Sequence, residues 1–194
     1  MNDRSRFFLR PLSREDSRAI FQLLQTIGKE ENAFHNDVNG MSYQEFREWL
    51  VLQEAWAKGE RLPKGYVRQW TFWLCVDDVP VGYGKLREHV TESSRLLGGN
   101  IGYAIGADYR GKGYGTVLFE LLLAKAEELQ LKEIVSTVEK NNLPSRRVHE
   151  KCGMLLLEET PERWVFYKNL ATDAESGRLF DDNTDKGDGT GVLS

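Results

Sequence analysis

GNIGYAIGADYRGKGYG, residues 99–115, is the stretch that decides the fold. Its first half alternates apolar and small residues at Ile101, Tyr103 and Ile105, which is the period of a strand. Residues 116–131 then place apolar side chains at helical spacing, opposite a polar face. A further apolar run at 132–138 predicts a second strand. We therefore expect a strand–helix–strand (βαβ) unit with a right-handed crossover.

The loop between strand and helix reads RGKGYG, with glycine at 111, 113 and 115. A glycine-rich loop at a helix N-terminus presents unpaired backbone N–H groups, and the helix dipole adds partial positive charge. Such a loop suits a phosphate or a pyrophosphate. The alternative is a tight turn without a ligand, but three alternating glycines favour a ligand site.

Two nucleotide motifs come close to this loop and fail. The dinucleotide fingerprint G-x-G-x-x-G meets Thr116 at its third glycine. The P-loop pattern fits from Gly106 to Lys112, but Gly113 stands where a serine or threonine would hold Mg²⁺. A P-loop nucleotide phosphatase therefore stays as a weak alternative.

A third motif, R-x-x-G-x-G, fits at Arg110, Gly113 and Gly115. It resembles the acyl-CoA pyrophosphate loop of the GNAT superfamily of N-acetyltransferases. The segment 142–154 is similar to that family's next motif, where Asn142, Ser145 and Gly153 match. The resemblance covers about residues 7–170. The run 98–103 further resembles a bacterial subgroup of predicted acetyltransferases.

The resemblance implies a fold of the α/β (α+β) class: a mixed, mostly antiparallel central sheet flanked by helices, with the βαβ unit holding the cofactor. It implies acetyl-CoA as the acyl donor. It also implies transfer of the acetyl group to a primary amine by direct attack in a ternary complex. The alternative function is a non-catalytic module that binds or senses acyl-CoA.

Cofactor contacts are expected along the strand, the loop and the following helix. The residues concerned are Tyr103, Ala104, Ile105, Arg110, Gly111, Lys112, Gly113, Tyr114, Gly115 and Asn142. The loop amides are expected to hold the pyrophosphate. As in the family, the backbone of the strand is expected to pair with the pantetheine arm, and Asn142 to hydrogen-bond the pantetheine or the adenine end.

The proton-transfer groups depart from the family pattern. His149 stands where many members place a tyrosine that protonates the thiolate, so it is a candidate acid or, equally, a packed helix residue. Tyr167 is the reserve acid. Gly98, Gly99 and Asn100 stand where some relatives carry a glutamate base. Glu88, with His89 and Glu92, is the candidate base; the alternatives are a water relay and inert exposed carboxylates.

Composition indicates one globular domain followed by a tail. Of the 194 residues, 40% are hydrophobic and 29% charged. The segment 171–194 carries six acidic and two basic residues, which equals the whole net charge of −4. We expect an acetyltransferase domain over 1–170 and a disordered acidic tail over 171–194. Because 1–170 has no basic excess, no nucleic-acid partner is expected.

The chain has no membrane-length apolar run and no signal segment, so we expect a cytoplasmic protein without a membrane partner. Cys75 and Cys152 have no metal-binding or disulfide spacing, so no metal site is expected. The expected partner is a small-molecule or peptide amine. The acceptor stays open among small amines, amino acids, antibiotics and protein N-termini, and a homodimer stays open as the assembly.

The remaining elements are predicted from caps and periodicity. Capping pairs at Ser13/Asp16 and Ser42/Glu45 predict two helices. The predicted strands are 7–9, 70–76, 81–86, 154–157 and 163–168, with a hairpin at 77–80, a short helix at 145–151, a connecting loop at 92–98, and a polar loop or broken helix up to Gly40.

Overall fold

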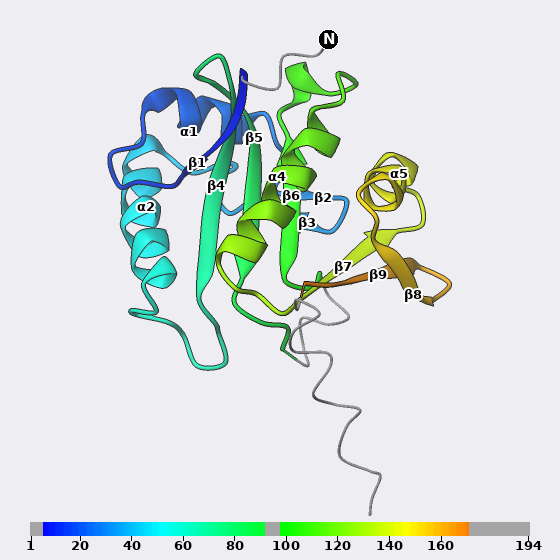
Figure 1. Ribbon diagram of the computed structural model, residues 1–194. Helices are drawn as coiled ribbons and strands as arrows, with labels where there is room; N and C mark the ends of the chain where they lie inside the picture. The colour runs from blue at the N-terminus through cyan, green and yellow to red at the C-terminus, as the bar shows by residue number, and fades with distance from the viewer. Residues whose placement is uncertain (1–5, 92–97, 171–194) are drawn as a thin grey trace, which may run out of the picture.

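The computed structural model describes residues 6–91 and 98–170, which form antiparallel sheets of four, three and two strands with helices packed around them (Figure 1). The elements are β1 Phe7–Pro11, α1 Arg18–Gln25, β2 Glu30–Glu31, β3 Phe34–His35, α2 Tyr43–Ala57, β4 Gln69–Val76, β5 Val79–Arg87, β6 Ile101–Ile105, the short 3₁₀ helix η2 Ala107–Tyr109, α4 Tyr114–Glu128, β7 Glu133–Glu139, α5 Leu143–Lys151, β8 Leu155–Glu159 and β9 Arg163–Asn169. The strand orders are β1-β4-β5-β6 and β7-β9-β8, so the expected mostly antiparallel architecture is confirmed.

The first sheet is buried on both faces because alternate residues of β4 enter different cores. Phe72, Leu74 and Val76 pack with residues of α4, whereas Trp73 and Cys75 pack with residues of α1 and α2. Figure 1 shows α1 and α2 on one side of this sheet and α4 on the other. A strand covered on both faces reads as a nearly continuous apolar run, as QWTFWLCV does.

The predicted strand, helix and strand of the βαβ unit are confirmed as β6, α4 and β7, but β6 and β7 belong to different sheets. They meet at their base, where Gly99 forms an isolated bridge with Ser136. The side chain of Asn100, which is only 1% exposed, joins β6 to β7 at this bridge. Its Oδ1 accepts from Val135 N at 2.8 Å, and its Nδ2 donates to the Glu133 carbonyl at 2.8 Å. Above it the two strands diverge, which opens a space between the sheets.

Two local predictions need correction. Helix α1 begins at Arg18 after Ser17, not after Ser13, because Asp16 is buried and accepts hydrogen bonds from Ser13 N and Trp73 Nε1. The polar stretch before Gly40 contains the hairpin β2–β3. Its turn places Asn32 and Ala33 at positive φ (54° and 63°). Alanine there gives no turn signal, so the sequence pattern missed the hairpin.

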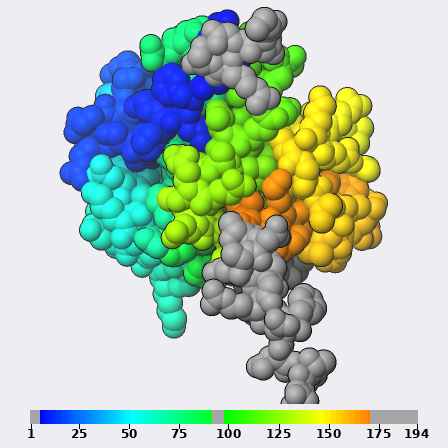
Figure 2. All heavy atoms as spheres, in the orientation of Figure 1, coloured from blue at the N-terminus to red at the C-terminus, as the bar shows by residue number. Residues whose placement is uncertain are grey.

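Other local predictions hold. Ser42 and Glu45 form the expected capping box of α2. Asp77 and Asp78 both take positive φ in the hairpin between β4 and β5. The predictions for residues 92–97 and 171–194 lie outside the described residues. In the described part of the chain, no helix is long and apolar enough to cross a membrane. Figure 2 shows α4, in green, lying between the N-terminal half and the strands and helix near the C-terminal end.

Candidate functional site

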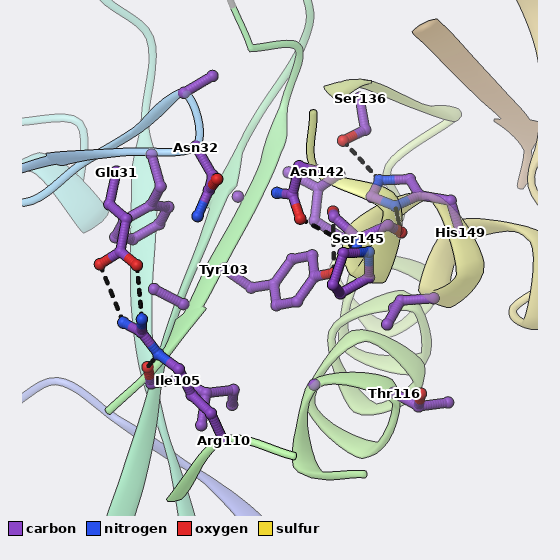
Figure 3. Close-up of a pocket in the computed structure, with 18 of the residues that line it drawn as sticks. Glu31, Asn32, Tyr103, Ile105, Arg110, Thr116, Ser136, Asn142, Ser145 and His149 are labelled. Atoms are coloured by element: carbon purple, nitrogen blue, oxygen red, sulfur yellow. Dashed lines mark hydrogen bonds and ion pairs between the residues drawn. The ribbon is translucent and has the colours of Figure 1, made fainter. Parts of the chain in front are cut away.

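A cleft of about 720 Å³ occupies the space where β6 and β7 diverge (Figure 3). This volume lies within the range of small-molecule sites. Its walls come from β6, β7, the loop 111–115, the start of α5, the β2–β3 hairpin and the end of β5. The cleft therefore collects segments from most of the chain. Nine of the ten residues predicted to bind the cofactor line it: Tyr103, Ala104, Ile105, Arg110, Gly111, Gly113, Tyr114, Gly115 and Asn142.

The glycine loop closes one end of the cleft. Gly111 and Gly113 have φ of 75° and 81°, a region that glycine adopts without strain, and a Cβ added at either would meet no atom within 4 Å. Among the described residues, none accepts a hydrogen bond from the backbone N–H groups of 111–115. These free donors lie at the N-terminus of the 15-residue helix α4. The loop is thus able to bind an anion.

The edge of β6 that faces the cleft offers further backbone groups. Arg87 N donates to the Asn100 carbonyl and Gly106 N to the Val81 carbonyl, which fixes the hydrogen-bonding phase of the β5–β6 ladder. By the alternation of an antiparallel ladder, Tyr103 and Ile105 turn their N–H and C=O groups away from β5, and Ala104 turns its own toward β5. The expected backbone contact at Ala104 is therefore corrected, while those at Tyr103 and Ile105 have free N–H groups.

The side chain of Arg110 binds other residues of the chain. Its guanidinium makes a two-pronged ion pair with the Glu31 carboxylate, at 2.6 and 2.9 Å, and its Nε donates to the Ile105 carbonyl at 3.0 Å. Figure 3 shows this pair closing one side of the cleft. The hydrogen bond from Arg110 is the main cause that lowers the pKa of Glu31. Arg110 thus ties the loop to the β2–β3 hairpin, a role that sequence spacing did not indicate.

Lys112 does not line the cleft. Its Nζ donates to the Asp108 carbonyl at 3.1 Å and lies 5.5 Å from the centre of the Tyr109 ring. In this position the side chain packs on η2, so the expected cofactor contact of Lys112 is limited to its backbone N–H.

Two polar residues of α5 face the cleft from the opposite wall. Asn142 caps the helix by accepting from Ser145 N at 3.2 Å, and its amide nitrogen points into the cleft (Figure 3). Ser145 Oγ shares a hydrogen bond of 3.1 Å with the Tyr103 hydroxyl. Burial raises the pKa of Tyr103 to about 12, so its hydroxyl keeps its proton at neutral pH. The cleft therefore contains a protonated hydroxyl beside the open edge of β6.

His149 is buried, with 1% exposure, among the rings of Tyr103, Phe119 and Phe166. Its Nδ1 lies 2.8 Å from the Ser145 carbonyl, which only accepts, so Nδ1 carries the proton. Nε2 then accepts from Ser136 Oγ at 2.8 Å. Burial lowers the pKa of His149 to about 4. The imidazole is therefore neutral at pH 7 and orients the Ser136 hydroxyl at the cleft wall.

The other two predicted catalytic residues lie outside the cleft. Glu88 follows β5 and pairs with Arg68, whose side-chain hydrogen bond is the main cause that lowers the pKa of Glu88. Tyr167 lies on β9, opposite Val135 of β7 and Leu155 of β8. Neither residue is among those that line the cleft in the described structure.

The end of the cleft away from the loop contains cations that the sequence reading missed. Lys85 and Arg87 line it from β5; Lys85 contacts His35 and Phe34 of the hairpin, and Arg87 donates to the Gly99 carbonyl. An alternating basic pattern in a strand resembles a solvated edge, so it gave no signal. The β2–β3 hairpin, which is distant from β5 in the sequence, packs against Lys85.

One buried side-chain oxygen of the cleft wall lacks a partner among the described residues. Thr137 Oγ1 on β7 is buried and has no hydrogen bond in the described structure. A buried hydroxyl without a partner costs free energy unless a ligand or water completes it. Among the described residues no cluster of His, Cys, Asp or Glu could hold a metal ion.

A family model described as "Acetyltransferase (GNAT) domain" matches residues 6–155. No curated protein matches the sequence. Two similar solved structures are a ribosomal-protein-S5-alanine acetyltransferase from Vibrio fischeri and a Salmonella typhimurium protein solved with its cofactor acetyl-CoA. The first is 14% identical with a TM-score of 0.65, covering 84% of this chain and 93% of its own. The second is 16% identical with a TM-score of 0.61, covering 86% and 95%.

A third similar structure is spermidine N-acetyltransferase from Vibrio cholerae in complex with CoA and spermine. It is 18% identical with a TM-score of 0.59, and the match covers 86% of this chain and 96% of that one. At these identities the three structures show a shared fold.

Proposed function

The chain belongs to the GNAT acetyltransferase family, and we propose that it transfers an acetyl group from acetyl-CoA to a primary amine by direct attack in a ternary complex. The observation that carries the proposal is the cleft between β6 and β7, which combines free loop amides, an open strand edge and a protonated hydroxyl. Solved structures with this fold include one with acetyl-CoA and one with CoA and spermine.

The residues of the cleft fit an acyl-CoA molecule. The free N–H groups of 111–115 suit the pyrophosphate, and the space beside Gly111 and Gly113 lets phosphate oxygens approach the backbone. The N–H groups of Tyr103 and Ile105 suit the amide carbonyls of the pantetheine arm. Asn142 Nδ2 supplies one more donor from the opposite wall. Donors therefore line the route from the loop to the base of the cleft.

Acetyl-CoA supplies a thioester carbonyl, at which the amine forms the N–C bond as the C–S bond breaks. A free N–H of the β6 edge is positioned to stabilise negative charge on the carbonyl oxygen. The Tyr103 hydroxyl is the proposed proton source for the sulfur, because it lines the cleft and is protonated at neutral pH. His149 acts as a positioning residue, since its neutral ring orients Ser136 and contacts Tyr103.

The amine nitrogen must lose a proton in this reaction. Glu31 is the one carboxylate that lines the cleft in the described part of the chain. Both of its carboxylate oxygens accept hydrogen bonds from the guanidinium of Arg110. We therefore assign the proton to water in the cleft, which agrees with the water relay left open by the sequence.

A thiol-release assay tests the proposal directly. The full chain is incubated with acetyl-CoA and a library of primary amines, and free CoA thiol is measured. We expect thiol release above the amine-free rate with at least one acceptor class, accompanied by the N-acetylated product in the mass spectrum. Thiol release that is independent of the amine would contradict acetyl transfer.

A non-catalytic acyl-CoA-binding module is the second candidate. The buried, neutral His149 favours it, since this residue stands at the position where many family members place a proton-donating tyrosine. Such a module would bind acetyl-CoA but would release no thiol with any amine of the library. The same assay, paired with a binding measurement, separates the two functions.

A further inference from the structure

Two cations, Lys85 and Arg87, line the base of the cleft, and no carboxylate among the described residues pairs with either of them. Lys85 is 6% exposed, and its Nζ donates to the His35 carbonyl at 2.8 Å. Arg87 Nη1 donates to the Gly99 carbonyl at 3.1 Å. Neither forms an ion pair in the described structure. Burial lowers the pKa of both side chains, that of Lys85 to about 8. Buried charges are usually paired, so this end of the cleft lacks an anion.

Among the described residues, the carboxylates near the two cations already have other partners. Glu31 is held by Arg110. Glu30 and Asp37, which attract Lys85 electrostatically, both hydrogen-bond the ring of His35, Asp37 at 2.7 Å. Their side chains are 70% and 39% exposed, so water screens them. In the described part of the chain, the carboxylates that attract Lys85 and Arg87 are therefore exposed ones that pair with His35, and neither cation has an ion-pair partner of its own.

The two cations lie closer to the expected binding place of the acceptor than to that of the cofactor phosphates. Lys85 is the cross-strand partner of Gly102, and the Phe34 ring lies against Gly102, where an added Cβ would meet it at 3.4 Å. Gly102 and Ile105 are separated along β6 by roughly 10 Å at the rise of a strand, and the loop lies beyond Ile105. The cations thus stand at the end of the cleft that the thioester would reach. An acceptor amine must approach the same place.

On the basis of the proposed function, we propose that the acceptor is a small amine that carries a carboxylate, as an amino acid does, and that Lys85 and Arg87 bind this carboxylate. The planar guanidinium of Arg87 matches a carboxylate in geometry, and Lys85 adds a compact positive charge. Phe34, whose ring lies over Gly102 and 5.1 Å from Lys85 Nζ, covers the apolar part of such an acceptor. A polyamine would instead bring positive charge to two cations.

The test compares each standard amino acid that has a primary amine with the amine its decarboxylation gives, and includes spermidine. Initial rates of thiol release give kcat and KM at saturating acetyl-CoA. We expect kcat/KM of the preferred amino acid to exceed that of its decarboxylated partner by at least about tenfold. In Lys85→Met the KM of that amino acid should rise about tenfold or more, while the decarboxylated amine is unaffected.

Two matched variants sharpen the comparison. Lys64→Met removes an exposed lysine outside the cleft and should leave the preference unchanged. Lys85→Arg keeps the charge and should keep most of the preference, whereas a proton-accepting role for Lys85 would be lost with arginine. Methionine fills the space of lysine without a buried charge, so Lys85→Met is expected to fold.

The outcomes separate the acceptor class from the proposed function. Equal turnover of both members of each pair, preferred turnover of spermidine, or an equal loss on both members in Lys85→Met would overturn the carboxylate site. So would an absence of amino-acid turnover in a chain that binds acetyl-CoA. Failure to bind acetyl-CoA at all would instead overturn the proposed function.

Discussion

His149 shows how a single buried side chain sets both stability and the shape of the site. Its imidazole is enclosed by aromatic rings and uses both nitrogens in hydrogen bonds. The ring therefore stays neutral in the folded protein down to the lowered pKa of about 4. In the unfolded chain a histidine takes up a proton near pH 6.5.

This difference predicts a loss of stability in mild acid. Between pH 6.5 and 4 the unfolded state binds more protons than the folded state. The free energy of unfolding therefore decreases as the pH is lowered through this range, by up to about 3 kcal/mol. His149→Gln should remove this part of the pH dependence. Urea unfolding of both proteins at pH 7 and pH 4.5 measures it, with His89→Gln, at an exposed position, as the control. Parallel pH profiles for wild type and His149→Gln would contradict the buried neutral ring.

The hydroxyl of Tyr103, the proposed proton source, can be tested by a single substitution. Tyr103→Phe removes the proposed proton source but keeps the ring that packs on Phe119. We expect kcat to fall about 100-fold with unchanged affinity for acetyl-CoA, because acid catalysis typically contributes a factor of that order. Steady-state kinetics checks this, with Tyr109→Phe, also at the cleft wall, as the control. An unchanged kcat would assign the proton to another group.

At the level of elements, the divergence of β6 from β7 depends on a short hinge at Gly99 and Asn100. A Cβ at Gly99 would lie 1.9 Å from the Val135 carbonyl oxygen, so only glycine allows the bridge to β7. Asn100 then satisfies two backbone groups of β7 with one side chain. In the sequence, both residues lie in the run 98–103 that resembles a family subgroup, where some relatives carry a glutamate base. The structure gives them the role of joining the two sheets.

Asn100→Ala tests this joint. It leaves the Val135 N–H and the Glu133 carbonyl without their side-chain partner in a buried place, so we expect the free energy of unfolding to fall by about 2–4 kcal/mol. Urea denaturation at pH 7 measures the loss. Asn39→Ala, which removes one half-buried hydrogen bond to Gln25, should cost less than about 1.5 kcal/mol. Equal losses in the two variants would remove Asn100 from its structural role.

For the whole molecule, sequence patterns predicted the parts with strong local signals. Alternation found β6, strand-forming runs on either side of a turn found β4 and β5, helical spacing found α4, and the capping box found α2. These features act within a few residues, so a single sequence displays them. The mostly antiparallel architecture came from the family resemblance, because strand order depends on contacts between distant segments.

The candidate site divides in the same way. The loop 111–115 was predicted because glycine spacing before a helix is a local signal, whereas Asn142 was predicted from the family resemblance. Other features of the site depend on contacts between different elements, so no local pattern indicates them. These are the Arg110–Glu31 pair, the Ser136–His149 hydrogen bond, and the position of the β5 cations at the cleft wall. Glu88 and Tyr167 were proposed from position alone, and the fold places them outside the cleft.

The proposed acyl-CoA site is tested most directly by titration calorimetry with acetyl-CoA, on the wild type and on Gly113→Asp. An aspartate at 113 would place a carboxylate among the free amides and repel the pyrophosphate. Gly65→Asp is the matched control, since Gly65 has φ of 83°, open space around its Cβ, and lies outside the cleft. We predict binding to the wild type and to Gly65→Asp, and an affinity at least 100-fold weaker, on the order of 3 kcal/mol, for Gly113→Asp. Equal affinity of all three proteins, or no binding to the wild type at millimolar acetyl-CoA, would contradict the site.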